Sequence, residues 1–221
     1  MGEEGIPMWI HLENIHEGAE ATVSTGLWLG KVSVLKSRRS RGYRHPDLDR
    51  RLTRQRLAAE SRILNRLSSE GFPSPSIIHL DDRNSNILMS KIEGKTLHDL
   101  LKTKEAGSSE LRKLGTTIRI LHEFGVSHGD LTTHNVMVSQ KGSISLIDFG
   151  LSRQSPEIEH LGLDLQVLNE CLSASHSSIP DAIEQVCNGY ISAGNKEKLA
   201  PSAVMVVERF RKITGRVRYH G

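Results

Sequence analysis

Three oxygen-bearing side chains, each at the edge of a short apolar run, mark the stretch of this 221-residue chain that could do chemistry. Asp130 precedes Asn135 by five residues, and Asp148 opens an Asp-Phe-Gly triplet. Phosphoryl transfer with magnesium needs such a set, because one carboxylate orients the attacking hydroxyl while an amide and a second carboxylate hold metal on the phosphates. The triplet alone carries little information. The ordered pair, beside the apolar runs 136–138 and 144–147, indicates this chemistry.

A lysine and a glutamate upstream could complete such a site. Lys36 follows the predicted strand 32–35, from which its ammonium group could reach the α- and β-phosphates of ATP if a helix carboxylate held it in place. Glu60 lies in the predicted helix 49–68, among neighbours that are mostly too small or too apolar to explain an acid there. Pairing with Lys36 would complete a set. The alternative is an ion pair with Arg56 inside the helix, worth about 0.3 kcal/mol.

The first part of the chain is predicted to form a small antiparallel sheet. Short apolar runs punctuated by glycines predict strands at 10–12, 21–23, 27–29 and 32–35, with tight turns at Gly18, Gly26 and Gly30. Two further strands, 77–80 and 86–89, follow the Pro-containing breaker 72–75. The segment Gly18-Ala19-Glu20-Ala21 is either a shortened loop over the phosphates or a plain hairpin turn, and local sequence favours neither.

A short connector ends the strand-rich part after Met89. Its backbone could hydrogen-bond the edge of an adenine, and the Ser90 carbonyl and the Ile92 amide are the groups best placed to do so. We therefore predict a domain boundary here, with a sheet-and-helix lobe at 1–93 and a mainly helical lobe at 94–221.

The second part is predicted to be helical. Apolar residues at helical spacing and flanking stop signals predict helices at 96–101, 109–124, 158–172, 179–191 and 201–213. Asp164 is an acid inside an otherwise apolar stretch of the third of these helices. It is expected to accept hydrogen bonds from the backbone of the catalytic loop, the alternative being an exposed helix position.

Composition excludes several classes of protein. Apolar content is 37% and aromatic content 4%, so the core should be aliphatic. No apolar run approaches the roughly 20 residues of a membrane span, and no signal-peptide pattern is present, so we expect a cytoplasmic protein with no membrane association. Cys171 and Cys187 are too isolated for a disulfide framework or a zinc site. Between Lys31 and Arg56, ten Lys and Arg face two acids, which permits a polyanionic partner.

The order and spacing of the candidate residues resemble the protein-kinase fold. This implies an α+β bilobal structure with a small antiparallel sheet and one long helix in the N-lobe and a reduced, mainly helical C-lobe. Two departures lie in the catalytic loop, where Gly129 replaces the usual arginine and Thr132 the usual lysine. Only about a dozen residues separate Gly150 from the helix of Asp164, so the fold should lack an activation loop.

The combination resembles the PRPK-type small atypical kinases, the kinase subunit of the KEOPS (EKC) complex. The resemblance rests on the segments 18–21, 42–49, 128–135, 147–152 and 215–218. It implies an ATPase and serine/threonine autokinase that uses ATP and Mg²⁺. It also implies work with a tRNA threonylcarbamoyl-transferase subunit and a small regulatory subunit to make threonylcarbamoyl-adenosine in tRNA. The family usually carries a small residue where this chain has His134.

The resemblance assigns roles to residues of this chain. Asp130 is the catalytic base or orienting carboxylate, Asn135 and Asp148 are the metal ligands, and Arg216 and Arg218 approach the active site or tRNA. The residues assigned to ATP binding are Gly18, Ala19, Glu20, Ala21, Lys36, Glu60, Met89, Ser90 and Ile92. Lys36 also counts as catalytic.

Two other functions remain open. A small-molecule kinase of the aminoglycoside or choline type shares His-Gly-Asp and a metal-binding Asp, although such enzymes usually need large helical insertions that the C-terminal half lacks. The chain could also be an ATP-gated binding module without a physiological phosphoacceptor, whose basic segments hold tRNA. ATP hydrolysis measured with and without tRNA and the transferase partner would separate these functions.

Overall fold

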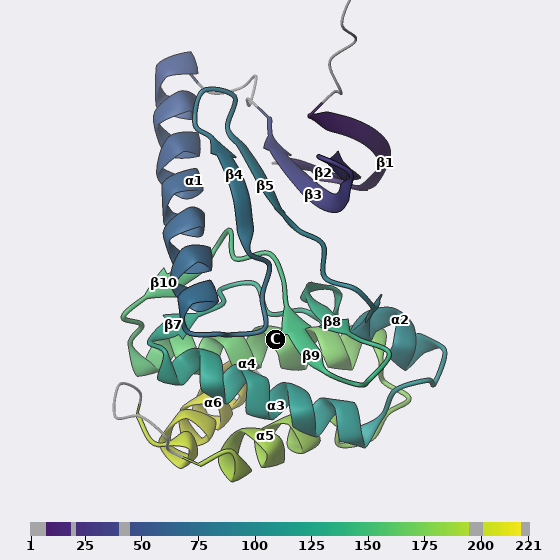
Figure 1. The fold of residues 1–221 in the computed structure, drawn as a ribbon. Helices are drawn as coiled ribbons and strands as arrows, with labels where there is room; N and C mark the ends of the chain where they lie inside the picture. Colours follow the sequence, from purple (N-terminus) through teal and green to yellow (C-terminus); the bar gives the residue numbers. More distant parts are fainter. Residues whose placement is uncertain (1–7, 19–20, 40–44, 195–200, 218–221) are drawn as a thin grey trace, which may run out of the picture. The chain divides into compact units, whose positions relative to one another are not determined.

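The structure of the chain, a computed structural model, divides into two compact units (Figure 1). The structure describes residues 8–18, 21–39, 45–194 and 201–217. One unit comprises Met1–Ser68 and Pro75–Ile92, and the other comprises Ser69–Ser74 and Glu93–Gly221. Among the helices of the described segments, none has the length and apolar character needed to cross a membrane.

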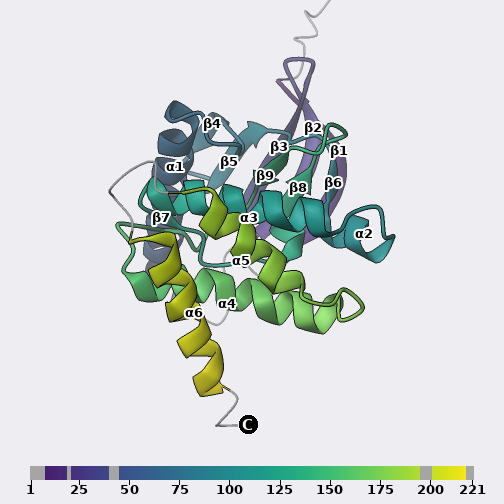
Figure 2. The same ribbon diagram turned by 90° about the horizontal axis from the view of Figure 1, so that it is seen from below.

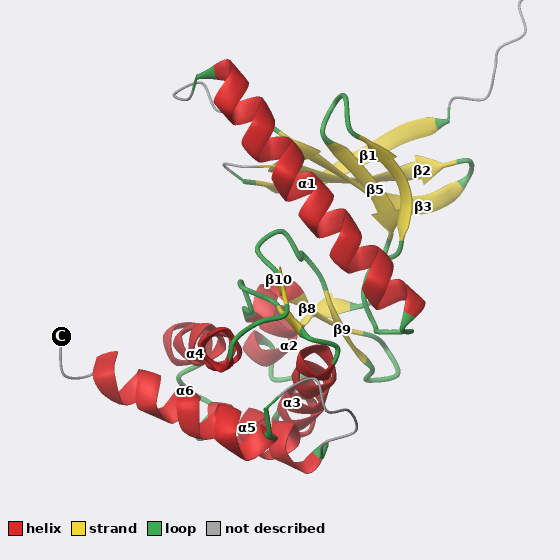
Figure 3. Cartoon of the chain, turned by 90° about the vertical axis from the view of Figure 1, so that its left-hand side faces the viewer, coloured by secondary structure: helices red, strands yellow, loops and turns green. Residues whose placement is uncertain are grey.

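The first unit is a five-stranded antiparallel sheet with one long helix. The strand order is β1-β2-β3-β5-β4. The strands are β1 (Trp9–Glu17), β2 (Ala21–Trp28), β3 (Lys31–Arg38), β4 (Ile77–Asp81) and β5 (Asn86–Ser90). Helix α1 (Pro46–Ser69) crosses one face of this sheet (Figure 3). Its first turn contains Asp47 and Asp49, acids that favour the amino-terminal end of a helix dipole.

The prediction of a turn at Gly26 is wrong. The two strands predicted at 21–23 and 27–29 are one continuous strand, β2, with Gly26 in its interior. A Cβ at Gly26 would lie 2.5 Å from both the Ile10 carbonyl oxygen and the Trp9 ring on the neighbouring strand β1. The glycine is therefore needed because the two strands pack closely. From the sequence alone, a glycine of this kind cannot be distinguished from one that forms a turn.

Lys36 lies inside a strand, although the sequence placed it just after one. In β3 it pairs with Val23 of β2 on one side and with Ile87 of β5 on the other. The core of this unit forms where Leu57 of α1 packs against Ile87 and Met89 of β5. A central strand of a sheet covered by a helix is a rigid support for a charged side chain.

The second unit is mainly helical, and five helices build its described part. They are α2 (Leu97–Lys102), α3 (Ser108–Glu123), α4 (Ile158–Ser175), α5 (Ala182–Ser192) and α6 (Ala203–Val217). Helices α3 and α5 lie side by side, as do α4 and α6 (Figure 2). The apolar stripe of α3, including Leu111, Leu114 and Ile118, is fully buried.

Two small sheets and a 3-10 turn carry the loops of this unit. One sheet has the order β6-β8-β9, and the other pairs β10 with β7. Their strands are β6 (Lys95–Thr96), β7 (Val126–Ser127), β8 (Val136–Val138), β9 (Ile144–Leu146) and β10 (Arg153–Gln154), and the 3-10 turn η1 spans Thr133–Asn135. Between Gly150 and the start of α4 at Ile158, a stretch that the structure describes throughout, the chain forms only β10 and two short loops, so no activation loop is present there.

Candidate active site

The ion pair expected between Lys36 and Glu60 is present in the first unit. Lys36 Nζ lies 2.7 Å from Glu60 Oε1, and both side chains are buried. Arg38 Nη2 lies 2.5 Å from the other carboxylate oxygen of Glu60. Because residues two apart on a strand face the same way, Lys36 and Arg38 reach the same carboxylate from β3. Arg38 is not among the residues predicted from the sequence, although its spacing of two from Lys36 was the available signal.

The loop between β7 and β8 brings Asp130 and Asn135 together. The Asn135 side-chain amide nitrogen donates to the main-chain oxygen of Asp130 at 2.8 Å and to its carboxylate at 3.1 Å. The turn η1 makes this contact possible, since the Asn135 main-chain amide also donates to the Thr132 carbonyl oxygen. With its side-chain nitrogen used in this way, Asn135 presents its side-chain oxygen as an acceptor.

Asp148 follows β9 in a left-handed backbone conformation, with φ of 60°. Such a conformation costs a non-glycine residue of order 1 kcal/mol, occurs in turns and also clusters at functional sites, and is tolerated by aspartate better than by most residues. The Gly150 amide donates to Asp148 Oδ1 at 3.2 Å, which orients the carboxylate within its turn. Phe149 between them is buried and contacts the His128 ring. The turn is thus anchored, through the side chain that follows the aspartate, to the loop 128–135, which is the predicted catalytic loop.

Gly129, the departure from the usual arginine, has a φ of 81°. A Cβ at this position would lie 2.3 Å from the Leu151 carbonyl oxygen. The segment after Asp148 therefore approaches the catalytic loop so closely that no side chain fits at Gly129. Ser152 Oγ strengthens this approach by donating to the His128 carbonyl oxygen at 2.9 Å.

Asp164 of α4 holds the backbone of the catalytic loop. Its carboxylate accepts hydrogen bonds from the main-chain amides of His128 at 2.7 Å and Gly129 at 2.8 Å. Burial by itself raises the pKa of Asp164, but the hydrogen bond and charge of His122 and the Gly129 amide lower the pKa below its ordinary value. Asp164 is thus a buried anion at neutral pH that fixes the backbone of the two residues before Asp130.

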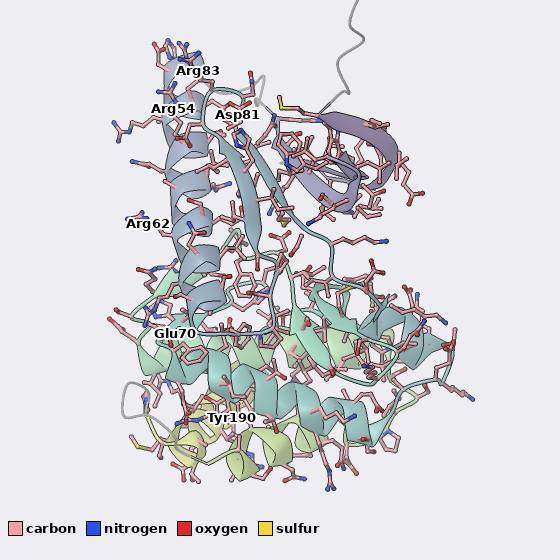
Figure 4. All side chains as sticks on the ribbon, in the orientation of Figure 1. Arg54, Arg62, Glu70, Asp81, Arg83 and Tyr190 are labelled. Carbon is pink, nitrogen blue, oxygen red and sulfur yellow. The ribbon has the colours of Figure 1, made fainter. Side chains whose placement is uncertain are left out.

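A line of buried polar side chains continues from Asp164 to α5. His122 Nε2 lies 3.1 Å from Asp164 Oδ2, and His122 Nδ1 lies 2.7 Å from the Tyr190 hydroxyl. Figure 4 labels Tyr190 on the α5 side of α3. Arg119 Nη1 lies 3.5 Å from the same hydroxyl and donates to the Pro201 carbonyl oxygen at 2.8 Å. His122 and Tyr190 are not among the residues predicted from the sequence, because they form no local motif.

His128 is neutral in this arrangement. Its Nε2 donates to the Ile147 carbonyl oxygen at 3.0 Å, and its Nδ1 accepts from the Asp130 amide at 3.3 Å. Complete burial lowers the pKa of His128, in agreement with a neutral ring. The histidine therefore ties the Asp148 strand to the catalytic loop and is not a charged group of the site.

A cluster of imidazoles surrounds the buried hydroxyl of Thr133. His98 Nδ1 lies 3.4 Å from Thr133 Oγ1, and His176 Nε2 lies 3.2 Å from it. His134, the residue that departs from the family pattern, stacks on His98 with ring centroids 3.7 Å apart. The cluster supports the turn η1, and among the described residues no group of three or more His, Cys, Asp or Glu side chains could hold a metal ion.

The remaining predicted residues fall in both units. Gly18 follows β1, and its amide donates to the Ala21 carbonyl oxygen at 3.0 Å, as in a tight turn. Met89 is buried in the core, and the Ser90 amide donates to the Ser76 carbonyl oxygen. Ile92 is half-buried in the connector after β5. Ala19, Glu20 and Arg218 lie outside the described residues, as does the side chain of Arg216. Their roles toward ATP or tRNA remain predictions.

Comparisons with known proteins match this chain to a kinase family and to subunits of the KEOPS complex. The model of the lipopolysaccharide kinase (Kdo/WaaP) family matches residues 30–182. The KEOPS complex subunit Bud32 of Pyrococcus abyssi is 35% identical, over 93% of this chain and 95% of that protein. The EKC/KEOPS complex subunit bud32 of Dictyostelium discoideum is 34% identical, over 84% of this chain and 77% of that protein.

A third relative is much longer than this chain. The probable bifunctional tRNA threonylcarbamoyladenosine biosynthesis protein of Methanothermobacter thermautotrophicus is 34% identical over 79% of this chain. The matched region spans only 32% of that protein. The chain therefore corresponds to about a third of such bifunctional proteins.

A solved structure confirms the predicted fold class. The Rio2 kinase from Chaetomium thermophilum superimposes with a TM-score of 0.62 over 94% of this chain and 73% of that one. Its sequence is 18% identical, so this likeness concerns the fold alone. The α+β kinase-like architecture, with a sheet-containing unit and a reduced helical unit, is as expected from the sequence.

Proposed function

Because this chain belongs to the Bud32 family of KEOPS complex subunits, we propose that it is an atypical kinase that uses ATP with magnesium and acts in the threonylcarbamoyladenosine modification of tRNA. The names of its relatives support the complex and the modification. The finer activities that we propose are serine/threonine phosphorylation and ATP hydrolysis. The proposed partners are tRNA, a threonylcarbamoyl-transferase subunit and a small regulatory subunit.

The contact between Asn135 and Asp130 carries the proposal. Their two hydrogen bonds, at 2.8 and 3.1 Å, hold an amide oxygen and a carboxylate within one short loop. Asp130 can accept the proton of an attacking hydroxyl or orient a water, which is the role of this position in phosphoryl transfer. The buried anchor at Asp164 keeps the loop from moving as charge develops.

The residues present fit a magnesium ion. Mg²⁺ prefers a few oxygen ligands from protein and completes its shell with phosphates and water, so one amide and one carboxylate are an adequate set. Asn135 and Asp148 would hold the ion, which when bound would neutralise charge on the transferred phosphate. The left-handed backbone at Asp148 agrees with this role, because such conformations cluster at functional sites as well as in turns.

Lys36, in the sheet-containing unit, is proposed to bind the phosphates. Its ion pair with Glu60 fixes the ammonium group, and Arg38 shares that carboxylate, so Glu60 is fully engaged in orientation. A buried lysine held in this way loses less side-chain entropy when it meets a phosphate. The proposed adenine contacts of Ser90 and Ile92 and the phosphate contacts of 18–21 belong to the same unit.

The test is the variant Asp148→Asn. Asparagine tolerates the left-handed backbone, so the fold should be preserved while the metal-binding charge is lost. We expect ATP turnover to fall by at least about 100-fold, which is about 2.7 kcal/mol of transition-state stabilisation. The matched control is Asp82→Asn, an exposed aspartate in the β4–β5 turn. Near-normal turnover by Asp148→Asn would contradict the assignment.

One observation favours a second candidate. The matching family model describes kinases of a lipopolysaccharide, which suggests a small alcohol or sugar hydroxyl as acceptor. ATP turnover should be measured alone, with tRNA and the transferase partner, and with small alcohols. Stimulation by tRNA and partner supports the first proposal. Stimulation by a small alcohol alone supports the second.

A further inference from the structure

The outer face of α1 carries exposed arginines that no part of the proposed catalytic chemistry uses. Arg51, Arg54 and Arg62 are all exposed, and the last two can be followed along the helix in Figure 4. Arg51 and Arg62 are 11 residues apart, which is about three turns of helix and about 16 Å. Gln55 lies between them on the same side of the helix, and Asn65 lies one turn beyond Arg62. Both are exposed and add hydrogen-bond donors.

The acids of α1 do not neutralise this face. They are Asp47, Asp49 and Glu60. Asp47 pairs with Arg50 at the start of the helix, Asp49 is buried, and Glu60 is buried against β3. Among the described residues, neither Arg51 nor Arg54 has a carboxylate partner, and Arg62 Nε donates to the Ala58 carbonyl oxygen of its own helix. The face is therefore a row of cations on a rigid support.

The composition of the face selects phosphates over bases. α1 contains no Phe, Tyr or Trp, so it offers no aromatic ring on which an unpaired base could stack. Arginine is suited to phosphate, since its planar group donates two parallel hydrogen bonds. Ala58, exposed near the middle of the row, leaves the surface flat. Duplex DNA carries about one charge per 1.7 Å of axis over both strands, so about 16 Å of a nucleic-acid duplex contains on the order of ten phosphates, of which those on the near side could meet α1.

We propose that the outer face of α1, formed by Arg51, Arg54, Gln55, Ala58, Arg62 and Asn65, is a docking surface for the phosphate backbone of a folded RNA helix. This inference rests on the proposed function, which supplies tRNA as the RNA. It assigns to α1 two faces with separate tasks. The inner face orients Lys36 through Glu60, and the outer face binds the substrate RNA without reading its sequence.

The test compares RNA binding by the full chain and by Arg51→Gln/Arg54→Gln/Arg62→Gln. Glutamine has a helix propensity close to that of arginine, so α1 should be retained. An unmodified tRNA transcript is the probe, titrated at several salt concentrations. We expect affinity to fall about 10- to 100-fold at low salt. The slope of log K against log salt should become shallower by about 2 to 3, close to one for each phosphate that the variant no longer neutralises.

A matched control removes three other exposed cations. Lys95, Arg112 and Arg211 each bond to a neighbour in the helical unit, namely Glu105, Gln185 and Glu184. The triple glutamine variant at these positions changes net charge equally and should leave tRNA affinity within about twofold of wild type. ATP turnover without RNA and thermal unfolding should be unchanged in both triple variants. A failure of the proposed catalysis would show as absent ATP turnover in the wild-type protein, which is measured independently of tRNA binding.

Three outcomes would overturn the inference. The first is an unchanged tRNA affinity and salt slope in the α1 variant. The second is an equal loss in the control variant, because net charge alone would then explain binding. The third is tighter binding of unstructured poly(U) RNA than of the tRNA transcript, because the surface would then not be selecting a folded RNA helix.

Discussion

His122 Nε2 lies 3.1 Å from Asp164 Oδ2, and this contact joins α3 to α4 next to the catalytic loop. The same carboxylate accepts the His128 and Gly129 amides, so a single buried anion is shared by two helices and a loop. His122 Nδ1 in turn lies 2.7 Å from the Tyr190 hydroxyl, so the same ring also connects the anion to α5. The geometry of the loop therefore depends on residues outside the proposed phosphate and metal ligands.

The variant Asp164→Asn should destabilise the protein and inactivate it together. Its amide nitrogen would face a main-chain N–H, which leaves a buried donor unsatisfied, so we expect a loss of about 3 kcal/mol in the free energy of unfolding. Tyr190→Phe removes only the hydroxyl and should cost about 1 kcal/mol. Urea unfolding and steady-state ATP turnover measure both effects. Equal stability of Asp164→Asn and wild type would contradict the anchor.

The variant Glu60→Gln should remove the buried negative charge that Lys36 and Arg38 share. Lys36 and Arg38 both contact this carboxylate, so its neutralisation should lower the free energy of unfolding by about 3 kcal/mol. The KM for ATP should also rise, since Lys36 loses its orientation. The control is Glu105→Gln, whose exposed carboxylate pairs with Lys95 and should matter little. If both variants unfold at the same urea concentration, Glu60 is not an essential partner.

The variant Gly129→Ala should combine backbone strain with a steric clash. Gly129 has a φ of 81° and its added Cβ would meet the Leu151 carbonyl oxygen at 2.3 Å. Gly30 has a φ of 78° with no heavy atom within 4 Å of an added Cβ. Gly30→Ala therefore reports strain alone, about 1 kcal/mol. Urea unfolding should show a clearly larger loss for Gly129→Ala. Equal losses in the two variants would remove the clash from the explanation.

Stability should fall as pH drops below about 6.5, the ordinary pKa of histidine. Burial, followed by the charges of neighbouring imidazoles and Lys102, lowers the pKa of both His98 and His176. A histidine with a lowered folded pKa binds protons more readily when unfolded, so its stability is complete above the unfolded pKa and is lost on acidification toward the folded one.

Thermal unfolding between pH 7.5 and 5 measures this dependence. His176→Gln should flatten the curve, because it removes one of the groups that must charge on unfolding. His11→Gln, an exposed histidine on β1, should leave the slope unchanged. If the wild-type protein became more stable from pH 7 to pH 5.5, the predicted loss of stability on acidification would be wrong.

The sequence alone determined the helices, the strands β3 to β5 and the order of the candidate residues. The helices of the second unit and the strands β3 to β5 follow from apolar periodicity and stop signals. These signals are local and can therefore be read from a single sequence. The five-residue spacing of Asp130 and Asn135 is of the same kind, because the single 3-10 turn between them closes their hydrogen bonds. A local pattern misled at Gly26, where a packing glycine resembled a turn.

Tertiary structure decided which distant side chains share a partner. Arg38 joins Lys36 on Glu60 only because β3 lies against α1, and Tyr190 reaches His122 across 68 positions of sequence because α3 and α5 lie side by side. The absence of a side chain at Gly129 likewise follows from the path of the segment after Asp148. Such contacts arise from packing between elements. The apolar periodicity of one element does not show which other elements pack against it.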